Sequence, residues 1–129
     1  MHLDSSFLIV DDENMIRKIV INFLKKAGYK SFYIAEDGAK ALDVLKFNSI
    51  DIIIADWNMP NVTGIELLDS VKGNEEWKDI PFIMLTAEAH EENVVAAGLR
   101  NATDYIIKPF TANTLLNKVT KALKRRIDR

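Results

Sequence analysis

The sequence predicts an α/β domain in which five short strands alternate with five helices. Short runs of β-branched and large apolar residues, without regular polar alternation, are typical of strands buried on both faces of a parallel sheet. Between these runs, apolar residues recur three and four positions apart, which is the spacing of a helix with one buried face. Strands that alternate with helices favour a parallel sheet with right-handed crossovers and helices on both of its faces.

Each element can be located from its apolar pattern and its boundary residues. The strand segments lie at residues 7–10, 32–35, 50–55, 81–85 and 105–107. Helices are predicted near residues 14–27, 38–47, 63–72, 88–100 and 111–127. Gly28 is expected to end the first helix, and Asp37 is expected to cap the start of the second. Residues 73–80 are expected to form a surface loop between the third helix and the fourth strand.

Length and composition fit one soluble domain and exclude several classes of function. The chain has 129 residues, of which 48% are hydrophobic and 28% charged, a balance that argues against disorder. Cysteine is absent, which excludes disulfides, thiolate metal sites and a cysteine nucleophile. The net charge of -2 predicts no nucleic-acid partner. No apolar run approaches the roughly 18 residues of a membrane span, and no signal peptide is evident, so we expect a cytoplasmic protein without a membrane partner.

Polar side chains suited to chemistry follow four of the five predicted strands. Asp11 and Asp12 follow the first strand and Asp56 follows the third. Thr86 follows the fourth strand and Lys108 follows the fifth. In open parallel sheets, ligands bind beyond the carboxyl ends of the strands. We therefore expect three carboxylates, a hydroxyl group and an ammonium group to meet at one edge of the sheet.

This set of groups indicates phosphoryl transfer with a magnesium ion. Three crowded carboxylates repel one another and either take up protons or bind a cation, and oxygen-only ligation favours Mg²⁺. Lys108 would supply a point charge for a phosphoryl oxygen and Thr86 a hydroxyl hydrogen bond. Phosphoryl transfer needs this kind of positioning and charge neutralisation. A carboxylate can itself be the nucleophile and form an aspartyl-phosphate.

Each of these residues also has an ordinary structural role that the sequence leaves open. Asp12 could cap the first helix, and Thr86 could cap the fourth. Asp56 could be a turn residue at the end of a strand, and Lys108 could be a solvated loop residue. Their joint occurrence at four strand ends is much less expected by chance than any one of them alone. The combination therefore favours the functional interpretation.

The pattern resembles the receiver domain of two-component response regulators. The resemblance spans about residues 7–123 and rests on Asp11-Asp12, Asp56, Thr86-Ala87 and Lys108-Pro109-Phe110. Two longer strings, residues 56–61 and 86–89, are similar to the stand-alone regulators of the chemotaxis branch. The resemblance implies a flavodoxin-like (βα)₅ fold with strand order 2-1-3-4-5, and a single receiver domain over residues 1–129.

The resemblance also implies a role for each residue at the strand ends. Asp56 would accept the phosphoryl group. Asp11 and Asp12 would hold Mg²⁺ together with Asp56 and the backbone carbonyl of Asn58. Lys108 would contact the phosphoryl group.

Further roles follow from the same resemblance for residues around the acceptor. Thr86 would move to hydrogen-bond the phosphoryl group, and Tyr105 would turn its ring between exposed and buried positions. Ala87 is small enough to leave space for the phosphoryl group. Asn58 and Glu88 occupy positions that tune the lifetime of the acyl phosphate. The chain departs from the closest pattern at Thr63, where an acidic residue is common, and at Asn101, where glycine is common.

The implied protein is a stand-alone, monomeric regulator that is no enzyme beyond self-catalysed phosphorylation and weak autodephosphorylation. Its partners would be a histidine kinase, a flagellar motor switch protein and a phosphatase. A single-domain receiver in a non-motility phosphorelay is one alternative. A small aspartyl-phosphate hydrolase is another, although Asn58 stands where such an enzyme needs a second carboxylate. A flavodoxin-like cofactor binder is disfavoured because Asp11, Asp12 and Glu13 would repel a phosphate.

Overall fold

The computed structural model describes residues 3–57, 59, 61–87 and 102–127, with only the backbone given for residues 126 and 127. The strands are β1 (Ser6–Val10), β2 (Ser31–Ala35), β3 (Ile52–Asp56), β4 (Phe82–Thr86) and β5 (Asp104–Ile107). The helices are α1 (Asn14–Lys26), α2 (Gly38–Phe47), α3 (Gly64–Lys72) and α5 (Ala112–Ile127). The helix expected at residues 88–100 lies outside the described part of the chain.

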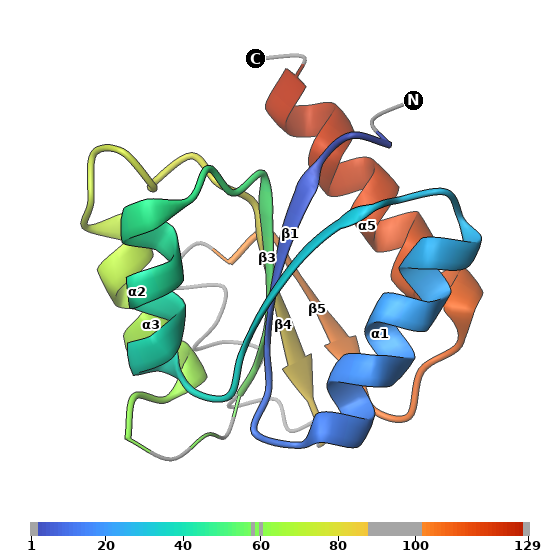
Figure 1. Cartoon of the computed structure of the whole chain (residues 1–129), viewed down its shortest axis with the longest axis horizontal. Helices are drawn as coiled ribbons and strands as arrows, with labels where there is room; N and C mark the ends of the chain where they lie inside the picture. Colours follow the sequence, from blue (N-terminus) through green and yellow to red (C-terminus); the bar gives the residue numbers. More distant parts are fainter. Residues whose placement is uncertain (1–2, 58, 60, 88–101, 128–129) are drawn as a thin grey trace.

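The strands form one parallel sheet in the order β2-β1-β3-β4-β5, which confirms the predicted α/β class and strand order. Helices α1 and α5 cover one face of the sheet, and α2 and α3 cover the other (Figure 1). Because all five strands run in the same direction, their carboxyl ends share one edge, which lies at the bottom of Figure 1. This edge brings residues from distant parts of the sequence together.

The core consists of two apolar clusters, one on each side of the sheet. In β1, Phe7 and Ile9 face the side of α1 and α5, whereas Leu8 and Val10 face the side of α2 and α3. The central strands β1, β3 and β4 are almost wholly buried, as the sequence predicts. Side chains of these strands pack in both clusters, so the central strands are a rigid support for the residues at their carboxyl ends.

The prediction of burial on both faces was wrong for the two outer strands. In β2, Ile34 is 52% exposed, and in β5, Ile107 is 40% exposed. Both strands lie at the edges of the sheet, where less of each face is covered. An apolar run in the sequence does not distinguish an edge strand from a central one, because strand order is decided by tertiary packing.

Strand β3 begins two residues later and ends one residue later than the sequence suggests. Its register pairs Ile52 with Phe7 of β1 and Asp56 with Leu85 of β4. The preceding Asp51 instead uses its carboxylate to accept a hydrogen bond of 2.8 Å from the backbone N–H of Ser6. Asp56 is consequently the last residue of the strand, held in the sheet, and not a flexible turn residue.

The ends of the helices follow local signals in most places. Gly28 adopts a φ of 107° just after α1, a conformation that favours glycine, and Asp37 caps α2 by accepting from the N–H of Lys40 at 2.9 Å. Helix α3 begins with a capping box between Thr63 and Glu66. Helix α1 starts after Glu13, and no side chain caps it, so a capping role for Asp12 is wrong.

Within the described residues, no helix is long and apolar enough to cross a bilayer.

Candidate functional site

Three carboxylates meet at the carboxyl edge of the sheet. Asp11 directly follows β1, Asp12 is the next residue, and Asp56 ends β3. One oxygen from each carboxylate lies within 4.8 Å of the others. Asp11 is fully buried and Asp56 is only 6% exposed, whereas Asp12 is exposed. The cluster therefore reaches from the protein interior to solvent.

Lys108 directly follows the outer strand β5 and contacts two of these carboxylates. Its Nζ donates hydrogen bonds to Asp11 Oδ2 at 3.0 Å and to Asp56 Oδ1 at 2.9 Å. The backbone N–H of Lys108 donates to the carbonyl of Thr86 at 2.7 Å, which ties the residue to the end of β4. One ammonium group against three carboxylates leaves two formal negative charges unbalanced when all four groups are ionised (3 − 1 = 2).

Burial and charge shift the proton equilibria of the site. Burial raises the pKa of Asp56 above its ordinary value, and the negative charges of Asp11 and Asp12 act in the same direction, against the hydrogen bond from Lys108. Burial alone would lower the pKa of Lys108, but its bonds to Asp56 and Asp11 outweigh burial and raise it. The site therefore holds Lys108 as a cation. Binding of a second cation near Asp56 would be electrostatically favourable, because the carboxylates outnumber the ammonium group.

The raised pKa of Asp56 predicts that the stability of the fold depends on pH. The folded protein binds this proton more tightly than the unfolded chain, so the resulting stability is present below the ordinary value of 3.8 and is lost as pH rises through the folded pKa. Asp56→Asn keeps an oxygen for Lys108 but does not titrate. In EDTA, we expect the variant's advantage in free energy of unfolding to grow between about pH 4 and pH 7. Urea denaturation measures it, and a constant difference would contradict the raised pKa.

The donor set of the cluster fits a magnesium ion. Asp11, Asp12 and Asp56 offer only carboxylate oxygens, which are the donors that a hard cation prefers. The cluster contains no histidine or cysteine. Asn58, whose backbone carbonyl was predicted as a further ligand, lies outside the described residues. Its neighbour Trp57 donates from its backbone N–H to the carbonyl of Leu85 at 2.8 Å, so the chain is held in place directly after Asp56.

The structure places two further predicted residues close to the cluster along the sheet. Thr86 is the last residue of β4 and is buried, next to the strand that Asp56 ends. Ala87 follows it and is exposed. Glu88 lies outside the described residues, as does the helix that Thr86 was considered to cap. Four predicted groups, on Asp11, Asp12, Asp56 and Lys108, are thus brought together, with Thr86 at the neighbouring strand end.

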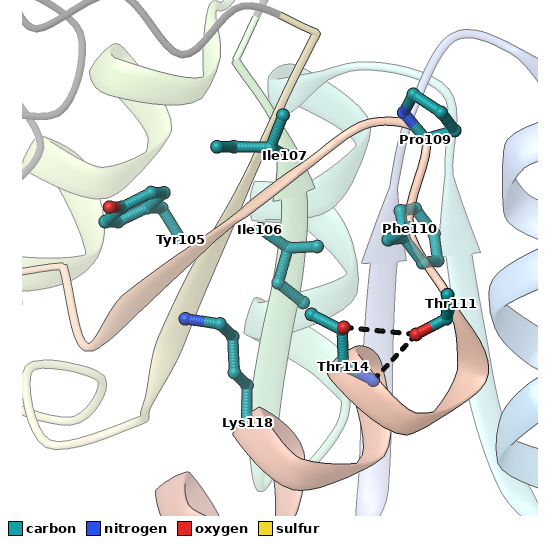
Figure 2. Close-up of a pocket in the computed structure, with 8 residues that line it drawn as sticks. All are labelled: Tyr105, Ile106, Ile107, Pro109, Phe110, Thr111, Thr114 and Lys118. Carbon is teal, nitrogen blue, oxygen red and sulfur yellow. Dashed lines mark hydrogen bonds between the residues drawn. The ribbon is translucent and has the colours of Figure 1, made fainter.

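Tyr105 lies on β5, two residues before the end of the strand, and borders a surface hollow. The hollow has a volume of about 320 Å³ and is lined by Tyr105, Ile106, Ile107, Pro109, Phe110, Thr111, Thr114 and Lys118. Figure 2 shows Lys118 reaching toward the half-buried Tyr105 ring, with its Nζ 5.2 Å from the ring centroid. The same ammonium group forms an ion pair of 2.8 Å with Asp104. The Tyr105 ring therefore has a cation–π contact with Lys118 of α5.

Gly64 was not among the predicted site residues, although it touches the acceptor. A Cβ at this first residue of α3 would lie 2.3 Å from the backbone oxygen of Asp56 and 3.0 Å from Trp57 Cα. The N–H of Gly64 also donates to the carbonyl of Trp57 at 3.1 Å. The available signal was a glycine inside a predicted helix, where it is a poor helix former and implies a close approach of backbones.

Comparison with known proteins identifies the class of the chain. Residues 7–120 match the family model of the response regulator receiver domain. The chain therefore belongs to this family, whose members are signalling proteins and not classical enzymes. The predicted resemblance is confirmed.

The relatives come from the chemotaxis branch among others. The chain is 41% identical over 125 residues to the chemotaxis protein CheY-3 of Vibrio cholerae serotype O1, covering 97% of this chain and 96% of the relative. The high-resolution structure of the chemotaxis response regulator CheY4 from the same species has a TM-score of 0.86 at 36% identity, covering 93% of this chain and 99% of that chain. A putative response regulator from Chloroflexus aurantiacus J-10-fl has a TM-score of 0.90 at 31% identity, with 95% and 99% covered. The chain is thus a CheY-like receiver.

Proposed function

We propose that this protein is a phosphorylation-controlled switch that accepts a phosphoryl group on Asp56 from a histidine kinase. Asp11, Asp12 and Asp56 would hold Mg²⁺ with the backbone carbonyl of Asn58. The observation that carries the proposal is the convergence of these three carboxylates within 4.8 Å, with Lys108 bonded to two of them. Receiver domains use such an acidic cluster for Mg²⁺, and the residues here have the donor chemistry that it requires.

In the proposed reaction, an Asp56 oxygen attacks phosphorus while the bond between phosphorus and the donor imidazole nitrogen breaks. The imidazole leaves with the electron pair and takes up a proton from solvent, and an acyl phosphate remains on Asp56. Magnesium supplies charge neutralisation for the phosphoryl oxygens when it is bound. Lys108 donates to one phosphoryl oxygen, since its Nζ already lies 2.9 Å from the acceptor carboxylate. Thr86 donates its hydroxyl hydrogen from the next strand end.

Residues around the acceptor would set how long the phosphoryl group stays. Ala87 leaves space for the group to sit beyond the end of β4, whereas Asn58 and Glu88 would tune access of water to the acyl phosphate. A phosphatase partner would act on the same group. These three roles are carried over from the family resemblance.

We propose that phosphorylation changes the binding of a partner protein at the surface around Tyr105. Thr86 and Tyr105 lie on neighbouring strands, because β4 pairs with β5 in the register Met84 to Tyr105. Movement of Thr86 toward a phosphoryl group would free space for the Tyr105 ring and reshape the hollow in Figure 2. Coupling of this kind is typically worth about 1–3 kcal/mol. We propose that the partner is a flagellar motor switch protein, because the chain aligns with relatives named as chemotaxis proteins.

We also propose that residues 1–129 act as a single, monomeric receiver domain in the cytoplasm. The receiver pattern alone occupies residues 7–120. The rival reading as an aspartyl-phosphate hydrolase needs a second acid–base carboxylate two residues after the acceptor, and the chain has Asn58 there. A receiver in another phosphorelay differs from the chemotaxis proposal only in its target.

Intact mass spectrometry tests the acceptor proposal. We expect natural protein incubated with Mg²⁺ and a small phosphodonor to gain one phosphoryl mass, and Asp56→Asn to gain none. Phosphorylated protein should then bind a motor switch peptide more tightly than the Asp56→Asn variant, by about five-fold or more. Absence of the added mass in natural protein would refute the acceptor. Equal peptide affinity in a protein that is phosphorylated would instead indicate a non-motility target.

A further inference from the structure

We propose that Asp37 and Asn61 form a latch that positions the loop between β3 and α3, and thereby sets the affinity of the site for Mg²⁺. Asn61 Nδ2 donates a hydrogen bond of 3.1 Å to Asp37 Oδ2, across 24 residues of sequence. Neither residue belongs to the carboxylate cluster. The inference rests on the proposed function, because that loop follows the acceptor Asp56 and contains the proposed ligand Asn58.

Asp37 is a rigid anchor for the latch. It is only 6% exposed, and both of its carboxylate oxygens are used. Oδ1 accepts from the backbone N–H of Lys40 at 2.9 Å and so caps α2, which leaves Oδ2 aimed at Asn61. The ammonium group of Lys40 pairs with Glu36, so the carboxylate of Asp37 is not tied to that exposed cation by an ion pair. A side chain held by a helix terminus offers a fixed point to a neighbouring loop.

The loop itself is shaped to reach this anchor. Asn61 has a φ of 65°, a left-handed conformation that asparagine tolerates better than most residues. The next residue, Val62, accepts a backbone hydrogen bond of 3.3 Å from Gly38. A Cβ at Gly38 would lie 2.8 Å from the backbone oxygen of Val62, so the two backbones approach closely. Figure 1 shows the starts of α2 and α3 at the same end of the molecule, beside the carboxyl edge of the sheet.

The remainder of the loop is pinned at the acceptor side. The carbonyl of Trp57 accepts from the N–H of Gly64 at 3.1 Å, and Met59 is buried in the cluster on the side of α2 and α3. The proposed ligand Asn58 belongs to this span in the sequence, so we expect the contacts at the two ends of the span to influence Mg²⁺ binding. The latch fixes the far end of this short span. Asp37 and Asn61 are therefore positioning residues that act through the loop.

Two variants cut the latch while keeping the local backbone. Asp37→Ser retains a good cap for α2 but has no second oxygen for Asn61. Asn61→Gly retains the left-handed conformation but has no amide. Glu66→Ala is the matched control, because it removes half of the capping box at the start of α3 and leaves the latch intact. Trp77→Phe in all proteins leaves Trp57 as the one tryptophan, since the sequence has two.

Titration of Trp57 emission with Mg²⁺ is the test. We expect the Kd for Mg²⁺ to rise about ten-fold in either latch variant, as losses of supporting contacts around metal sites do, and to stay near the natural value in Glu66→Ala. The double variant should bind as weakly as each single one, because both remove the same interaction. At saturating Mg²⁺, phosphorylation by a small phosphodonor should recover to near the natural rate.

The outcomes separate the latch from the proposed function. Unchanged Mg²⁺ affinity in Asn61→Gly, in a protein whose natural form is phosphorylated, would overturn the latch and leave the proposed function standing. Additive losses in the double variant would also overturn it, because they would show two independent effects. No Mg²⁺ response in the natural protein would overturn the proposed function, and the latch with it. Asn61→Gly alone decides the question if Asp37→Ser fails to fold.

Discussion

Replacing Lys108 by methionine is expected to slow Mg²⁺-dependent phosphorylation of Asp56 by about 10²- to 10³-fold, the effect of losing one charge-stabilising donor at a reacting oxygen. Lys108 is the cation that bonds both Asp11 and Asp56 in this structure. Methionine has a similar length and fills the same space, but it has no proton to donate. The loss should therefore appear in the transfer step more than in packing.

The rate of mass gain with a small phosphodonor at saturating Mg²⁺ measures this effect. Lys78→Met is the control, because Lys78 forms an ion pair of 2.8 Å with Glu75 on an exposed loop away from the site. We expect the control to react at the natural rate. A Lys108→Met protein that is phosphorylated as fast as the control would remove Lys108 from the proposed chemistry.

Replacing Gly64 by alanine is expected to lower the free energy of unfolding by about 3 kcal/mol, at the upper end for forcing extra atoms into a packed site. The new methyl carbon would start 2.3 Å from the backbone oxygen of Asp56, and neither that oxygen nor Trp57 Cα belongs to a side chain that can rotate away. Helix α3 must shift, and the acceptor must shift with it. Weaker Mg²⁺ binding should accompany the loss of stability.

Gly73→Ala is the matched control at the other end of the same helix. A Cβ at Gly73 would lie 3.2 Å from the carbonyl of Asp69, and its φ of -82° suits any residue. We expect Gly73→Ala to change the free energy of unfolding by less than about 1 kcal/mol. Chemical denaturation measures both variants. Equal stabilities for the two would contradict the close approach of α3 to the acceptor backbone.

Much of the site could be predicted from the sequence because its chemistry is local to the strand ends. Asp11, Asp56 and Lys108 each stand where an apolar run stops, and parallel strands bring such points to one edge. The pattern therefore predicted which groups meet before any distance was known. It did not predict their different environments: Asp11 and Asp56 are buried, whereas Asp12 is exposed.

The contacts that hold the site were decided by tertiary structure. Asp37 was predicted only as a cap for α2, which it is, but its second oxygen binds Asn61 from a loop 24 residues away. Gly64 carries no chemistry, and its role depends on how closely α3 approaches Asp56. Exposure of Ile34 and Ile107 likewise follows from the strand order and not from their own neighbours in sequence.

The sequence by itself determined the α/β class, most of the helix and strand positions and the set of polar groups at the strand ends. Periodicity, caps and strand-end chemistry are properties of adjacent residues, so they can be read along the chain. Tertiary structure alone decided burial at the sheet edges, the hydrogen bonds of Lys108 to Asp11 and Asp56, and the contacts of the loop after Asp56. These depend on atoms brought together across the fold, where a shift of about one ångström changes which groups can touch.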